Sequence, residues 1–115
     1  MTANKVISML DKCEAYIDMS CLCTAGQARI IADYLDENGF SPWDGSSMFR
    51  YIETRFLTIR DYSCLVCKDK QKQLLTANQC GFSYATRITA LSFLQMIQNE
   101  ARKRISAEDF DSILI

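Results

Sequence analysis

A chain of 115 residues with 49% apolar and 23% charged residues has the composition of one globular domain, neither disordered nor long enough for two domains. Histidine is absent, which excludes Ser-His-Asp and Cys-His nucleophiles, histidine acid–base catalysis and every histidine-containing metal site. The net charge of −1 is unevenly distributed: residues 1–45 sum to −4, residues 46–104 to +6 and residues 105–115 to −3. This asymmetry indicates either a surface for a charged partner or acidic and basic segments that face each other within the fold.

The first helix is expected over residues 3–20, because apolar residues recur there at steps of three and four, as on one face of a helix. Three carboxylates fall on a neighbouring face of the same predicted helix: Asp11, Glu14 and Asp18. Such an acidic stripe suits a basic partner or Mg²⁺, with an ordinary solvated helix face as the alternative.

A capping-box pattern, Thr-x-x-Gln at 24–27, predicts a second helix that Gly39 ends. The connection that follows, residues 40–47, holds two large aromatic side chains, Phe40 and Trp43. Aromatic residues on a loop either anchor a binding partner or close one end of a small core.

A third helix is expected from residue 46 or 47 to about residue 60, with apolar residues along one edge. The next segment, 61–78, is compatible with a helix or with a β-hairpin over residues 62–77. The lack of Gly or Asn where a tight hairpin turn would need one favours the helix.

Residues 83–105 predict the central helix of the fold, apolar around most of its circumference and therefore buried among other elements. Ser83 is its expected cap, and a last short helix is expected to begin at Ser106. The whole pattern predicts an all-α fold: one domain, residues 1–115, in which five or six helices form a compact bundle around the central helix.

The cysteines offer the one spacing typical of a metal site, Cys21-x-Cys23 followed by Cys64-x-x-Cys67. Four thiolates can bind Zn²⁺ tetrahedrally and add folding energy to a small domain. However, the intervening residues are leucine and valine, and a Cys-x-Cys pair is a poor tetrahedral clamp. Free cysteine also packs well as a small apolar residue, so four core thiols are the favoured interpretation and a structural zinc site is the alternative.

Motifs for catalysis are missing: the four glycines form no phosphate-binding loop, and no pair of carboxylates has a spacing that argues for acid–base chemistry. We therefore expect a non-catalytic protein–protein interaction module, such as a regulator, adaptor or inhibitor of the kind that phages and mobile elements often encode. Its expected contact residues are Asp11, Glu14, Asp18, Phe40, Trp43, Arg50, Arg55, Lys68, Lys70 and Lys72.

The alternative function is a nucleic-acid-binding regulator that uses the basic residues between 50 and 104, although an isoelectric point near 5.3 is low for that class. The longest apolar runs span only a few residues, and the first residues lack the apolar region of a signal peptide. We therefore expect a cytoplasmic protein without membrane contact. A homodimer is compatible with the sequence.

Overall fold

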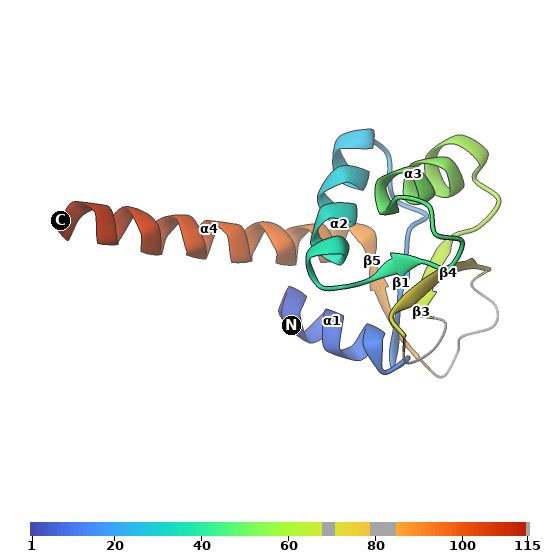
Figure 1. The fold of residues 1–115 in the computed structure, drawn as a ribbon, viewed down its shortest axis with the longest axis horizontal. Helices are drawn as coiled ribbons and strands as arrows, with labels where there is room; N and C mark the ends of the chain where they lie inside the picture. The colour runs from blue at the N-terminus through green and yellow to red at the C-terminus, as the bar shows by residue number, and fades with distance from the viewer. Residues whose placement is uncertain (68–70, 79–84, 115) are drawn as a thin grey trace.

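The computed structural model describes residues 1–67, 71–78 and 85–114, and of residues 103–114 the helical backbone alone. These residues form an α/β fold with a five-stranded mixed sheet and four α-helices (Figure 1), so the predicted all-α bundle of five or six helices is wrong. In chain order the elements are α1 (Ala3–Asp11), β1 (Ala15–Asp18), α2 (Ala25–Glu37), β2 (Ser41–Pro42), α3 (Met48–Ile52), the π-helix η1 (Glu53–Ile59), β3 (Cys64–Cys67), β4 (Gln73–Ala77), β5 (Thr86–Thr89) and α4 (Ala90–Leu114).

The strand order of the sheet is β2-β4-β3-β1-β5. β1 lies parallel to β5 and antiparallel to β3, and β3 lies antiparallel to β4. It follows that β1, β4 and β5 run in the same direction. Their carboxyl ends meet at one edge of the sheet, beside the start of β3.

The two faces of the sheet have different surroundings. Alternate strand residues point to opposite faces, and Ile17, Leu65 and Ile88 join the helices in the main core. Tyr16 and Cys64 belong to a smaller buried cluster on the other face, which we call the second face. The second face also carries Asp18, two residues after Tyr16 in β1.

The predicted first helix over residues 3–20 is wrong beyond Asp11. Cys13 has a left-handed φ of 59°, which ends the helical path, and residues 15–18 then form β1 between β3 and β5. Strand pairing with distant segments therefore overrides the local helical periodicity. The acidic stripe does not form, because Asp11 lies in α1, Glu14 in the turn and Asp18 in β1.

The preference for a helix over residues 61–78 is also wrong, because this segment contains the antiparallel strands β3 and β4. Cys64 pairs with Ala77 and Cys67 with Leu74. Lys72 has a φ of 58° just before β4, and the turn itself falls partly on residues 68–70, outside the described residues.

The central segment differs from its prediction at both ends. The expected cap Ser83 lies outside the described residues, Thr86–Thr89 form strand β5, and α4 begins at Ala90. The helix then continues to Leu114, so no separate short helix starts at Ser106. Figure 1 shows α4 extending away from the rest of the molecule, with the C-terminus at its far end.

Two local predictions are confirmed. Thr24 and Gln27 form both hydrogen bonds of the capping box at the start of α2. The third helix begins after the cap residue Ser47, which accepts a hydrogen bond from the Arg50 backbone, although its second half is π-helical.

Candidate functional site

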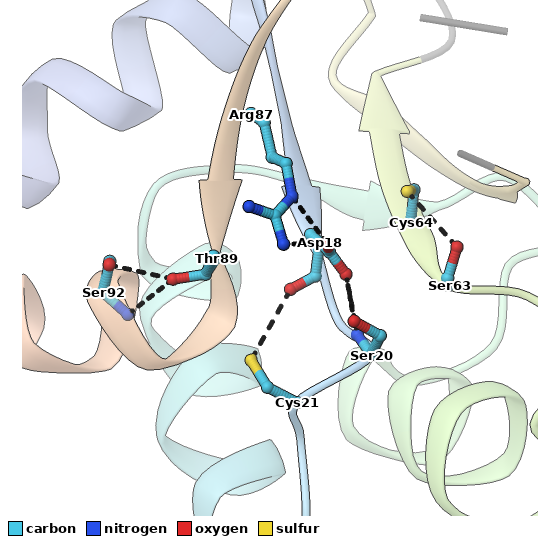
Figure 2. Close-up of polar contacts among 8 residues, drawn as sticks. All are labelled: Asp18, Ser20, Cys21, Ser63, Cys64, Arg87, Thr89 and Ser92. Carbon is cyan, nitrogen blue, oxygen red and sulfur yellow. Dashed lines mark hydrogen bonds and ion pairs between the residues drawn. The ribbon is translucent and has the colours of Figure 1, made fainter. Parts of the chain in front are cut away.

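Polar side chains gather at the edge of the sheet where β1 and β5 end (Figure 2). Asp18 is the last residue of β1 and Thr89 the last of β5, while Ser20 follows β1 and Ser63 precedes β3. In α/β sheets, ligands bind preferentially outside the carboxyl ends of the strands, because the loops that follow these ends can diverge there. This edge is therefore the first place to look for a binding site.

Asp18 is the centre of this polar group, and its side chain accepts three hydrogen bonds and forms an ion pair although the residue is only 1% exposed. Oδ1 accepts from the Ser20 backbone N–H at 3.0 Å and from the Ser20 hydroxyl at 2.6 Å. Oδ2 accepts from Nε of Arg87 at 2.7 Å and forms an ion pair with Nη2 of Arg87, also at 2.7 Å. Burial raises the pKa of Asp18, but the hydrogen bonds from Ser20 and Arg87 outweigh it and hold the pKa below its ordinary value of 3.8.

Arg87 reaches Asp18 from the neighbouring strand, since it pairs with Tyr16 in the parallel register of β1 and β5. Half of its side-chain surface is exposed to solvent. Nε and Nη2 are bound to Asp18, and no partner of Nη1 occurs in the described part of the chain. The buried carboxylate therefore fixes the guanidinium in one orientation and leaves part of it facing outward.

A surface pocket of about 270 Å³ adjoins Asp18 through Ser20, which bonds Asp18 and lines the pocket; we call it the carboxyl-end pocket. Its floor consists of the buried apolar residues Met19, Leu22 and Phe56. Its rim is polar and consists of Ser20, Arg60, Asp61, Tyr62, Ser63 and Asn78. Polar residues therefore make up most of the lining and the apolar floor is small, so a bound group would be held mainly by hydrogen bonds and charge.

One wall of the carboxyl-end pocket comes from an unusual stretch of backbone. Phe56 belongs to the π-helix η1, and Arg60 follows it with a left-handed φ of 59°, its N–H bonded to the Arg55 carbonyl at 3.1 Å. π-Helices are rare and occur often at functional sites, and a left-handed non-glycine residue costs about 1 kcal/mol or more. The π-helix and the left-handed Arg60 are both unfavourable for the backbone, and their occurrence at one pocket is typical of a functional site.

Two large apolar side chains lie exposed beside the same wall. Ile59 is 47% exposed and Tyr62 is 37% exposed. Tyr62 lines the carboxyl-end pocket, and Ile59 directly precedes the pocket residue Arg60 in the chain.

The structure separates the contact residues that the sequence suggested. Phe40 is 2% exposed and lies in the main core, whereas Trp43 is 49% exposed. Lys72 donates to the Asn38 carbonyl at 3.1 Å and lies 5.4 Å from the centre of the Phe40 ring. Lys68 and Lys70 lie outside the described residues.

The remaining cations of the basic middle segment do not share one surface role. Arg50 is exposed on α3, Arg55 lies 5.5 Å from the centre of the Tyr51 ring, and Arg87 binds Asp18. The Asp18–Arg87 pair is one ion pair within the fold between the acidic first part of the chain and its basic middle segment.

The four cysteines do not come together. Cys64 lies on the second face and Cys67 in the main core, as expected for residues three apart in a strand. Cys21 is half-buried, and Cys23 is exposed. Among the side chains described, those of residues 1–67, 71–78 and 85–102, no group of three or more Cys, Asp or Glu is arranged to hold a metal ion.

Sequence reasoning named Asp18 for a different role, grouped Arg60 and Arg87 only with the basic residues of the nucleic-acid alternative, and missed the serines. The contact of Arg87 with Asp18 depends on the pairing of β1 with β5, and no local sequence pattern indicates that pairing. The left-handed conformation of Arg60 has no sequence signal either, since glycine is the residue that usually marks it.

Among the helices of the described residues, none is both long and apolar enough to cross a membrane. Comparison of the chain with protein-family models, curated proteins and solved structures gives no match.

Proposed function

We propose that this chain is a non-catalytic protein-interaction module and that its partner binds at the carboxyl-end pocket. The observation that carries the proposal is a surface pocket whose lining includes the exposed Tyr62, with the exposed Ile59 directly before the pocket residue Arg60 in the chain. Partner residues that fill such pockets supply most of the energy of an interface, and exposed tyrosines are frequent among the contacts that do so.

The chemistry of the polar group supports binding more than catalysis. Asp18 already accepts three hydrogen bonds, is paired with Arg87 and has a lowered pKa, so it orients Arg87 and is poorly suited to take up a proton at neutral pH. Thr89 is similarly occupied, because it donates to the Ser92 hydroxyl at 2.8 Å and accepts from the Ser92 backbone at 3.2 Å.

Site-specific photo-crosslinking in the source cells tests this proposal. A photoreactive residue in place of Tyr62 is expected to capture one defined protein. The same residue in place of Leu91, which is 49% exposed at the start of α4, is the matched control and should not capture it.

A second variant in the same experiment checks that capture depends on the pocket. Adding Ile59→Asp should reduce the yield at position 62 about tenfold or more, because it replaces the exposed apolar side chain before Arg60 with a charge. Ile59 is half exposed, so the fold should tolerate the change. Equal capture from positions 62 and 91, or crosslinks only to nucleic acid, would refute the proposal, and the second result would support the nucleic-acid alternative.

A further inference from the structure

The rim of the carboxyl-end pocket also indicates what kind of partner segment enters it. Building on the proposed function, we infer that this segment carries an anionic group, a carboxylate or a phosphate, next to an apolar side chain. Arg60 binds the anionic group, and the apolar side chain lies on the floor of Met19, Leu22 and Phe56.

Arg60 is tied to the protein by one end of its guanidinium. Nε donates to the Leu57 carbonyl at 3.3 Å, at the end of η1. The guanidinium has five N–H donors, and within the described residues Nη1 and Nη2 have no protein partner. This arrangement limits the motion of the side chain and leaves its outer donors for a ligand, which lowers the entropy cost of binding.

Two further donors line the same rim. The Tyr62 hydroxyl and the Asn78 side-chain amide have no hydrogen-bond partner in the described part of the chain, and both residues are exposed. Together with Arg60 they form a set that is rich in donors. An oxyanion satisfies such a set best, because each of its oxygens accepts more than one hydrogen bond.

The nearby charges permit an anion at this position. Asp18 is bonded to the pocket residue Ser20, and its charge is balanced by Arg87. The one opposing charge among the described pocket residues is Asp61. Removal of the Arg60 charge should therefore lower the affinity for an anion, and removal of the Asp61 charge should raise it.

Three small peptides test the inference: acetyl-Asp-Leu-amide, acetyl-phosphoserine-Leu-amide and the neutral acetyl-Asn-Leu-amide. Each supplies the same apolar leucine for the pocket floor. Titrations are followed by NMR through the arginine Nε–H signals at constant ionic strength. At least one anionic peptide is expected to bind about tenfold more tightly than the neutral one and to shift the Arg60 signal. The tighter of the two distinguishes a carboxylate from a phosphate.

Two variants test how each charge affects the affinity for the anionic peptide. Arg60→Gln should lower the affinity for the anionic peptide about tenfold, whereas Asp61→Asn should raise it about threefold. The Arg29 signal is the internal control, since Arg29 stacks on Phe49 at 3.7 Å and lies 3.9 Å from Asp33, in α2. It should not shift.

The inference is overturned if none of the peptides binds, if the neutral peptide binds as tightly as both anionic ones, or if Arg60→Gln leaves the affinity unchanged. Its failure can be separated from failure of the proposed function. If capture at position 62 persists in Arg60→Gln at the wild-type yield, the interaction stands and the anionic chemistry is wrong. Loss of the difference between positions 62 and 91 refutes the interaction itself.

Discussion

The substitution Asp18→Asn removes the charge at the centre of the polar group and nearly preserves the shape of the side chain. The asparagine oxygen can still accept from Ser20, but the amide nitrogen then faces Nε and Nη2 of Arg87, which are also donors. Alternatively, the amide flips and faces the donors of Ser20. The first orientation leaves the Arg87 donors without an acceptor, and the second leaves the Ser20 backbone N–H without one, because only the Ser20 hydroxyl can turn to accept from the amide.

The expected loss of stability is about 2–3 kcal/mol. Removing one partner of a fully buried ion pair costs about 3–5 kcal/mol, and each hydrogen bond lost from a buried group costs about 1–3 kcal/mol. The lower figure applies because half of the Arg87 side chain is exposed, so water can bind its freed donors. For a domain of this size, about 2–3 kcal/mol corresponds to a fall in Tm of roughly 8–12 °C.

Urea denaturation followed by far-UV circular dichroism measures the effect, with Arg87→Gln and the double variant completing a double-mutant cycle. Because the two residues act through one interaction, the loss of stability in the double variant should be smaller than the sum of the two single losses by about 1 kcal/mol or more. A loss below about 0.5 kcal/mol for Asp18→Asn, or strict additivity, would refute the assignment of Arg87 to a buried carboxylate.

Three further predictions concern the pKa of Asp18, the burial of Phe40 and Trp43, and the backbone of Arg60. The pKa of Asp18 is lowered in the folded protein, so its contribution is complete above about pH 4 and is lost as the pH falls through the folded pKa; urea titrations below pH 4 should show the stability gap between wild type and Asp18→Asn shrinking, and a constant gap would contradict this. Phe40→Ala should cost about 3–5 kcal/mol and Trp43→Ala less than about 1 kcal/mol, since one ring is buried and the other half exposed; similar losses would place both rings in one environment. Arg60→Gly should leave thermal stability unchanged or raise it by up to about 1 kcal/mol, because glycine adopts a φ of 59° without strain, yet it should reduce photo-capture at position 62; a clear loss of stability would give Arg60 a structural role.

The sequence was informative where structure depends on residues three or four positions apart. The capping box of Thr24 and Gln27, the stop near Gly39 and the cap at Ser47 all act within one helical turn, and each occurs where it was predicted. The central helix was predicted only in part: α4 is helical from Ala90, but only one side of it is buried, with Phe93, Leu94 and Ile97 in the core and Leu91 49% exposed.

The candidate site was predicted poorly for a different reason. Asp18 was noted as a carboxylate on a helix face, and Phe40 and Trp43 were grouped because they are close in the chain. The structure places Asp18 on a strand beside Arg87 and divides the two aromatic residues between core and surface. Neither outcome depends on neighbours within one turn, so neither could be found from periodicity.

The sequence alone therefore determined the helices that carry their own caps and the absence of histidine chemistry. The tertiary structure decided where the strands lie. Ile17 has the spacing of a helical residue, but it pairs with Leu65 on one side and Ile88 on the other, and these contacts exist only after distant segments meet. Backbone hydrogen bonds and apolar burial across the sheet outweigh a helical propensity that differs by less than 1 kcal/mol per residue. The same pairing brings Arg87 to Asp18 and so creates the polar group beside the carboxyl-end pocket.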